Sequence, residues 1–235
     1  MAKRFWTADP HYGNPNISLY CGRPWVKPCH LNAQGQWISP EAALEVAEAN
    51  NRILLKNHNS RVKQEDTTIC VGDYACKGNE KGVAGFRDKP ADLISKQNGT
   101  YIIIEGNHDF CNGVKTVAEF MTVSIGRYHA GVQHIPLLDE KVYNDYMALS
   151  PEAKAKSGFK NTMSQSMRDF CFRHAKYCRE NLDFIICGHV HNKWRVKKIA
   201  GIWHINVGVD VCRYMPIDDQ EVLTIYEKTI REYGK

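Results

Sequence analysis

The sequence contains no long hydrophobic run, because none of its apolar stretches approaches the roughly 20 residues that a helix needs to cross a bilayer. The first nine residues, Met-Ala-Lys-Arg-Phe-Trp-Thr-Ala-Asp, also lack the apolar stretch of about 7–15 residues that a signal peptide carries. These two absences argue against a membrane protein and predict a cytoplasmic protein that makes no membrane contact.

Closely paired cysteines are missing as well. The chain has nine cysteines, an odd number, and no two of them form a C-x-x-C pair. Because zinc sites built on thiolates use such close spacing, the sequence argues against one. Cys70 and Cys187 lie inside apolar runs, which favours buried free thiols over disulfides.

The excess of positive over negative charge is small, because the net charge is +5. The chain has no dense cluster of Lys and Arg of the kind that binds nucleic acid, and the nearest approach to one is the segment 195–198. A positive excess can attract phosphate-bearing substrates. On charge alone, however, the pattern favours a mildly basic, solvated surface. The sequence has neither an internal repeat nor a low-complexity tract.

Short apolar runs alternate with helical patterns. A helix is expected to begin at Ser39-Pro40, where an N-cap serine precedes proline at the first helical position, and two more are expected over 164–181 and 218–231. Near-continuous apolar strands indicate a sheet that is covered on both faces, and their alternation with helices predicts an α/β fold. The expected strands lie in the runs 5–8, 68–71, 101–104, 131–133 and 184–187.

The whole chain, 1–235, is expected to form one domain. Three stretches interrupt the rhythm of strands and helices and are rich in Gly, Pro, Asn, Lys and Ala, namely 21–38, 77–88 and 139–163. We interpret them as insertions. Long loops of this kind are often functional lids, and they can equally be surface decoration.

Residue types that bind metals follow directly after the apolar runs. In open α/β sheets ligands bind beyond the carboxyl ends of the strands, so these side chains are expected to meet at one rim. Imidazole and carboxylate ligands without a thiol favour Mn, Fe, Co, Ni or Zn. Seven ligands exceed the needs of one cation, and the sequence therefore predicts two cations, about 3.5–4 Å apart. The candidates are Asp9, His11, Asp73, Asn107, His134, His189 and His191.

Taken one at a time, these motifs are weak. Asp9-Pro10-His11 is typical of a turn with a capping aspartate, and Gly72-Asp73 of an ordinary turn. Gly188-His189-Val190-His191 is more specific, and so is Gly106-Asn107-His108-Asp109, where glycine is expected to let the backbone turn sharply. The occurrence of all of them in this order, each behind an apolar run, favours a functional interpretation.

Asp-x-His, Gly-Asp, Gly-Asn-His-Asp, a lone His and Gly-His-x-His, in this order, resemble the motifs of the calcineurin-like metallophosphoesterases. The resemblance runs from about residue 5 to about residue 217 and implies two facing mixed sheets flanked by helices, as a four-layer sandwich. It is closest to small bacterial and phage-type members, which share stretches similar to Asn16-Ile17, Arg23-Pro24, Asn59-Ser60-Arg61-Val62 and Asn206-Val207-Gly208-Val209-Asp210.

The resemblance also implies how the ligands divide between the two metals. Asp73 would bridge them. One metal would be held by Asp9, His11, Asp73 and His191, and the other by Asp73, Asn107, His134 and His189.

Three histidines compete for the fourth motif. His134 ends an apolar run and is followed two residues later by Pro136, as in the family's His-x-Pro. His129 lies five residues earlier on the same expected strand, so the alternation of side chains turns it to the opposite face. His174 lies at helical spacing with apolar neighbours, which is typical of a core or surface histidine. We predict that His134 is the ligand.

The resemblance implies attack by a hydroxide that bridges the metals. His108 would protonate the leaving alkoxide or stabilise its charge, and Asp109 would either orient His108 or cap the following turn. Arg23 is a candidate phosphate clamp, with a surface arginine as the equal alternative. Asn14 stands where related chains usually carry histidine, and its amide can hydrogen-bond a phosphate oxygen. His204 and Asn206 are expected to support the rim.

In the phosphoprotein phosphatases Gly-Asp is followed by a second Asp and an Arg, whereas this chain has Cys76 and Lys77 there. This difference disfavours a Ser/Thr protein phosphatase.

The sequence therefore predicts a metal-dependent phosphoesterase with two divalent cations, manganese preferred, that acts on phosphate monoesters or diesters, nucleotides included. A nuclease acting on DNA or RNA with the same fold is the alternative. It would need a basic or aromatic face, and only 195–198 beside Trp194 offers one. A non-catalytic interaction module ranks lowest, because such proteins usually lose a ligand or the acid histidine, and His108 and every matched ligand are present here.

Overall fold

The computed structural model describes residues 2–75, 89–109, 112–150, 152–153 and 165–234, and side chains of the last range from residue 170 onward. The described residues do not include the expected insertion 77–88, positions 151 and 154–163 of the expected insertion 139–163, or Cys76 and Lys77.

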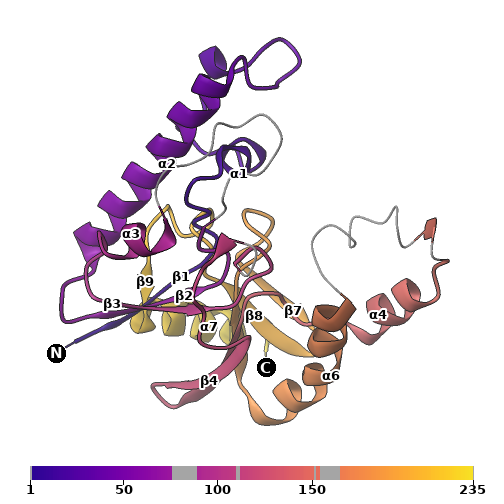
Figure 1. Cartoon of the computed structure of the whole chain (residues 1–235). Coiled ribbons are helices and arrows are strands. Elements are labelled where there is room, and N and C mark those ends of the chain that lie inside the picture. Colours follow the sequence, from indigo (N-terminus) through magenta and orange to yellow (C-terminus); the bar gives the residue numbers. More distant parts are fainter. Residues whose placement is uncertain (1, 76–88, 110–111, 151, 154–164, 235) are drawn as a thin grey trace.

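Two mixed sheets form the centre of the molecule (Figure 1). In the first sheet three strands are parallel and the fourth is antiparallel to its neighbour; the order is β3 (Thr100–Ile104), β2 (Thr67–Val71), β1 (Arg4–Thr7) and β9 (Ile217–Asp218). In the second sheet the two edge strands are antiparallel to their neighbours; the order is β4 (Phe120–Ile125), β5 (Tyr128–Gln133), β6 (Phe184–Cys187), β8 (Ile202–Asn206) and β7 (Val196–Ile199).

The sheets face one another through a shared hydrophobic core. Trp6, Ile69 and Val71 of the first sheet belong to one cluster with Phe184 and Ile186 of the second. This cluster also contains Val222 and Tyr226 of α7 (Asp219–Tyr233), which therefore closes one side of the core.

Helices cover the outer face of each sheet. On the first sheet, Val46 of α2 (Pro40–Arg61) and Leu93 of α3 (Pro90–Ile94) pack in one cluster with Cys70. On the second sheet, Cys178 of α6 (Gln165–Asn181) packs with Ile185. The order helix, sheet, sheet, helix is the four-layer α/β sandwich that the sequence predicts, and the predicted fold class is confirmed.

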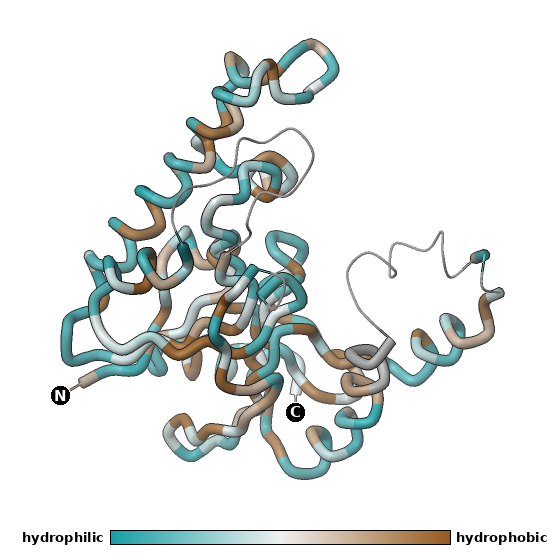
Figure 2. The backbone as a smooth tube through the Cα atoms, viewed as in Figure 1, coloured by the Kyte–Doolittle hydropathy of each residue, from teal (hydrophilic) through white to brown (hydrophobic). Residues whose placement is uncertain are grey.

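The start of α2 follows the sequence signal. The Ser39 side chain accepts a hydrogen bond from the amide of Ala42 at 3.2 Å, and Pro40 occupies the first turn. Hydrophobic and hydrophilic residues alternate along this helix (Figure 2), and two asparagines, Asn50 and Asn51, interrupt its buried stripe. The outer end of α2 projects beyond the sheets (Figure 1).

Each strand expected from an apolar run is present, whereas β4, β7, β8 and β9 were not expected. The two edge strands β4 and β7 each contain two exposed residues, so they carry little apolar signal. Three α-helices were also not expected. These are α1 (Pro15–Tyr20), α3, and α4 (Glu140–Met147), the last inside the predicted insertion 139–163.

Among the described residues every cysteine is a free thiol, as predicted, and five of them are buried: Cys70, Cys171, Cys178, Cys187 and Cys212. No described helix combines the length and apolar character that a membrane span requires.

Candidate metal centre

The loops that carry the candidate ligands leave the carboxyl ends of neighbouring strands. Asp9 and His11 follow β1, Asp73 follows β2, and Asn107 follows β3. In the second sheet, His134 follows β5, and His189 and His191 follow β6. Because the ends of parallel strands meet at one edge, side chains far apart in the sequence come together there.

Backbone strain is concentrated in these loops. Five of the seven candidate ligands have a positive φ: Asp9 (56°), His11 (46°), Asp73 (54°), His189 (68°) and His191 (49°). This left-handed conformation is uncommon for residues other than glycine and costs about 1–3 kcal/mol each. Such strain tends to cluster at functional sites, because it directs side chains to positions that regular structure would not give them.

Two glycines allow the loops to approach one another. At Gly72, which has a φ of 82°, a Cβ atom would lie 2.5 Å from Nδ1 of His134. At Gly106 a Cβ would lie 2.3 Å from the amide nitrogen of Asp73. The glycine of the third motif is thus required by close packing, whereas a sharp turn through positive φ was expected, and Gly106 has no positive φ.

The first group of ligands consists of Asp9, His11 and His191, whose ligand atoms lie within 4.8 Å of one another. The rings of His11 and His191 are stacked, with centroids 5.1 Å apart. His11 is fully buried, and neither of its ring nitrogens has a hydrogen-bond partner. Buried polar atoms normally find a partner, and a bound cation would supply one for the ring nitrogen that faces this group.

The second group consists of Asp73, His134 and His189, again with ligand atoms within 4.8 Å of one another. The amide oxygen of Asn107 lies between the two imidazoles, 3.2 Å from Nε2 of His134 and 3.0 Å from Nδ1 of His189. An amide oxygen here completes a set of oxygen and nitrogen ligands.

Asp73 lies between the two groups. Its Oδ2 atom is 3.2 Å from Nε2 of His134 and 3.4 Å from Nε2 of His11, which belongs to the first group. Its Oδ1 atom accepts a hydrogen bond from the amide of His108 at 2.9 Å. A carboxylate in this place can contact two cations at once.

Hydrogen bonds orient two of the imidazoles. Nδ1 of His134 lies 2.7 Å from the carbonyl oxygen of Val71, and Nδ1 of His191 lies 3.0 Å from Oδ2 of Asp210. When Nδ1 donates its hydrogen to such an acceptor, Nε2 presents its lone pair to the site.

The carboxylates raise the pKa of two histidines. Burial alone would lower the pKa of His134, but the Asp73 carboxylate beside it raises that pKa to about 9. Burial likewise opposes the charged form of His191, yet Asp9 and Asp210 raise its pKa to about 10. Without a cation, protons on these two imidazoles therefore balance the buried carboxylates.

The other two imidazoles are neutral. Burial lowers the pKa of His189 to about 3, with a contribution from His134, and it holds the pKa of His11 well below its usual range. Neutral imidazole is the form that binds a metal.

This set of donors fits divalent cations. It combines imidazoles with carboxylate and amide oxygens, contains no thiolate in either group, and suits Mn, Fe, Co, Ni or Zn. A third cluster, Cys21 with His191 and Asp210, overlaps the first group at the rim. Its Asp210 carboxylate is already engaged by Arg23.

Comparison with known families then identifies the chain, because the model of the calcineurin-like phosphoesterase family matches residues 5–193. The chain belongs to this family. The resemblance found in the motifs is thereby confirmed.

Individual relatives add little about this family member beyond its fold. An uncharacterized protein of Methanocaldococcus jannaschii is 28% identical over 109 residues, which are 46% of this chain and 48% of that protein, so the match spans about half of this curated relative. The crystal structure of a protein of unknown function from Aquifex aeolicus superposes with a TM-score of 0.57 and 19% identity, over 96% of this chain and all of that one. This likeness supports the two-sheet architecture.

In this member of the family Arg23 does not fit the predicted role of a phosphate clamp. The residue is 1% exposed, and acceptors within the protein occupy all five of its N–H donors. They are both carboxylate oxygens of Asp210, the carbonyl oxygens of Asp9 and Pro10, and the side-chain oxygen of Asn50. Arg23 is therefore a buried support that holds Asp210 and the loop after β1, and it is not a surface arginine either.

Asn14 and Asp109 also bond to backbone amides. The Asn14 side chain caps α1 by accepting hydrogen bonds from the amides of Asn16 at 2.9 Å and Ile17 at 3.4 Å. Asp109 accepts three bonds of 2.8 Å each, from the amides of Asp73, Tyr74 and Gly106. Of the two roles expected for Asp109, orienting His108 receives no support from these contacts, because the carboxylate instead ties the β3 loop to the β2 loop.

His108 lies at the edge of the cluster. Its ring lies edge-on to that of His11, with centroids 5.4 Å apart, and it lines the cavity above the ligands. Within the described residues it belongs to neither ligand group.

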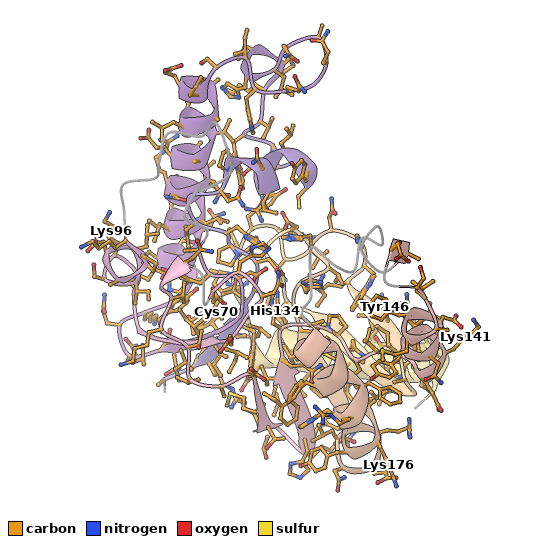
Figure 3. The ribbon with its side chains drawn as sticks, turned by 45° about the vertical axis from the view of Figure 1, so that its right-hand side comes forward. Cys70, Lys96, His134, Lys141, Tyr146 and Lys176 are labelled. Atoms are coloured by element: carbon orange, nitrogen blue, oxygen red, sulfur yellow. The ribbon has the colours of Figure 1, made fainter. Side chains whose placement is uncertain are left out.

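The three histidines of the fourth motif occupy different regions. His134 lies at the centre of the molecule (Figure 3) and belongs to the second ligand group. His129 is exposed, with Nδ1 3.2 Å from the hydroxyl of Ser124. His174 stacks on Phe170 with centroids 4.2 Å apart. Neither of the two rivals lies in a ligand group.

Sequence reasoning missed two supports of the site. Asn50 accepts from Arg23 at 2.7 Å and donates to the carbonyl of Pro10 at 3.3 Å. The signal that could have indicated it is an asparagine on the largely apolar stripe of α2. Asp210 was noted only as the end of a motif, although it is the partner of His191.

Two further residues support the rim as expected. Asn206 donates to the carbonyls of His191 and Trp194 at 2.8 Å each. His204 accepts from the amide of Leu137 at 3.2 Å.

Proposed function

We propose that this protein hydrolyses phosphate monoesters or diesters with two divalent cations, with manganese as the preferred metal. Asp9, His11 and His191 would hold one cation, Asn107, His134 and His189 the other, and Asp73 both. The observation that supports this most is the buried His11 ring, whose two nitrogens have no partner at the junction of two ligand groups.

Bound cations would activate a water molecule and offset the negative charge of the phosphate. The protein's own contribution is to fix the ligands in place. Asp109 and Arg23 hold the loops through backbone amides and carbonyls, and Asp210 and the carbonyl of Val71 hold two imidazoles.

His108 is the proposed proton donor. Its backbone amide is bonded to Asp73, which places the ring next to the ligand groups without making it a ligand. An imidazole in this place would protonate the oxygen that leaves when the phosphorus–oxygen bond breaks.

The test is reconstitution of activity. The protein is stripped with a chelator, manganese is added back, and hydrolysis of p-nitrophenyl phosphate and bis(p-nitrophenyl) phosphate is measured together with the metal content. We expect turnover to return with manganese, and the substrate that is hydrolysed faster distinguishes monoester from diester activity. No turnover of either ester with Mn, Fe, Co, Ni or Zn would contradict the proposal.

A further inference from the structure

A cavity of about 720 Å³ opens over the ligand groups. Four of the ligands line it together with His108, namely Asp73, Asn107, His189 and His191. Much of the remaining wall is apolar and includes Ile17, Tyr20, Leu138, Val142 and Trp194. A volume of several hundred Å³ lined in this way is typical of a site for an organic molecule. A phosphate group alone would need only the polar part.

Two lysines, Lys193 and Lys197, line the same cavity as the ligands. Neither makes an ion pair with any residue that the structure describes. The one carboxylate on this part of the wall, Asp139, accepts a hydrogen bond from the amide of Ala200. The two ammonium groups thus offer a place for a second anion.

The other cations of the basic segment face elsewhere. The Arg195 guanidinium donates to the carbonyl of Val211, and Nζ of Lys198 lies over the Trp203 ring at 5.4 Å from its centroid. The alternation of side chains along β7 separates Lys197 from Lys198 in this way. Lys141 and Lys176, on α4 and α6, lie on the outer side of the molecule, away from His134 (Figure 3).

A track for a nucleic-acid backbone needs a series of cations along one face, and among the residues that the structure describes two lysines line this cavity. The structure therefore favours a small molecule over DNA or RNA. Aromatic rings with flat faces, such as those of Trp194 and Tyr20, bind planar bases by stacking.

We infer that the substrate is a nucleotide with two phosphate groups, one hydrolysed at the metal ligands and the other bound by Lys193 and Lys197, with its base against Trp194. This inference rests on the proposed function and names its substrate class. The oxygen of water forms a bond to the phosphorus of the first phosphate, and the bond between that phosphorus and the ribose oxygen breaks. The ribose oxygen takes up a proton and leaves as a hydroxyl group, while the second phosphate stays unchanged.

Hydrolysis of four esters, assayed with manganese, tests the second phosphate and the base separately. They are adenosine 3′,5′-bisphosphate, AMP, octyl phosphate and p-nitrophenyl phosphate. We expect kcat/KM to be highest for the bisphosphate, about tenfold above AMP, because a charge-assisted contact to phosphate is stronger than a neutral hydrogen bond. Turnover of p-nitrophenyl phosphate without preference among the other three would overturn this inference and leave the proposed function standing. A higher kcat/KM for octyl phosphate than for AMP would overturn the choice of a nucleotide.

Matched variants locate the contacts. Lys197→Ala should reduce the preference for the bisphosphate over AMP about threefold, because Lys193 remains, whereas Lys198→Ala, its neighbour on the opposite face of β7, should leave it unchanged. Trp194→Leu should lower kcat/KM for both nucleotides about tenfold, with Trp203→Leu as the control. Equal effects of the two lysine variants would overturn the assignment.

If the chain hydrolyses none of the four esters, a binding measurement tests the inference instead. Calorimetry with adenosine 3′,5′-bisphosphate in the presence of manganese should give a Kd that Lys197→Ala weakens about threefold and Lys198→Ala does not. Absence of binding would overturn the inference independently of turnover.

Discussion

His11 and Asp73 face one another where the loops after β1 and β2 meet, with Nε2 of the imidazole 3.4 Å from Oδ2 of the carboxylate. Both side chains are at most 2% exposed, and the imidazole has no hydrogen-bond partner on either nitrogen. Asp73 also lies 3.2 Å from Nε2 of His134. One carboxylate thus connects the two ligand groups, and several tests follow from this connection.

Replacing Asp73 should affect both cations. Asp73→Asn removes the charge that both groups share, so we expect metal content to fall at both sites, whereas His191→Ala should weaken mainly one. Metal analysis of chelator-free protein measures this, and the unmodified chain should approach two ions. A stoichiometry that never exceeds one in excess manganese would contradict the two-metal proposal.

Replacing His108 should slow turnover without releasing metal. General acid catalysis contributes about 10²–10⁴-fold, so His108→Ala should lose activity of that order on esters with poor leaving groups, such as alkyl phosphates. The loss on p-nitrophenyl esters should be much smaller, because that leaving group hardly needs a proton. Equal losses on both types of ester would indicate a structural or metal-binding role.

The three histidines of the fourth motif should behave differently. His134→Ala should empty one metal site or abolish most activity, because this imidazole lies against Asp73 and Asn107. His129→Ala and His174→Ala serve as matched controls and should retain two metals and most turnover. If His174→Ala released a metal while His134→Ala retained both, the assignment of the ligand would be wrong.

The buried pair of Arg23 and Asp210 should stabilise the fold. Its side chains are 0% and 2% exposed, and Arg23→Ala would leave the buried Asp210 carboxylate without its guanidinium partner and with only the contact to His191, so we expect a loss of unfolding free energy of about 3–5 kcal/mol. Arg61→Ala is the control, since its pair with Glu221 is 30% and 42% exposed and should contribute at most about 1 kcal/mol. Urea unfolding of the metal-free proteins measures both. Unchanged stability of Arg23→Ala with a raised KM would restore the role of a phosphate clamp.

Metal affinity should rise with pH. In the metal-free protein the pKa of His134 is raised to about 9 by Asp73, against the opposing effect of burial, and the pKa of His191 is raised to about 10 by Asp9 and Asp210. Cations bind the deprotonated imidazoles, so binding should strengthen from pH 7 towards pH 9 and release protons. Calorimetry in two buffers of different ionisation enthalpy measures both effects, and an affinity independent of pH would contradict the expectation.

The stability of the metal-free chain should fall as pH rises, whereas metal affinity should rise. A pKa that is raised in the folded state contributes stability that is fully present below the ordinary histidine pKa of about 6.5 and is lost as pH rises through the folded value. For His134 and His191 this loss falls between about pH 6.5 and 10. Thermal unfolding should therefore show a Tm that falls over this range without metal, and the fall should be smaller with manganese bound.

The sequence by itself determined which loops carry the chemistry. Apolar runs marked β1, β2, β3, β5 and β6, and the residue types behind them marked Asp9, His11, Asp73, His189 and His191, because strand hydrophobicity and ligand chemistry are both local properties. The order of the motifs was sufficient to indicate the family. By contrast, β4 and β7 lie at sheet edges with exposed sides, so no local pattern identified them.

Only the tertiary structure decided what each polar side chain contacts. Arg23 has the residue type of a phosphate clamp, yet Asp210, 187 positions along the chain, engages it. Asp109 stands next to His108 in sequence but bonds to backbone amides of the β2 loop. Hydrogen-bond partners that are distant in sequence are set by packing, since a buried charge takes the nearest acceptor or donor that the fold provides. The cavity with Lys197 on its wall and Lys198 turned away depends on β7 for the same reason.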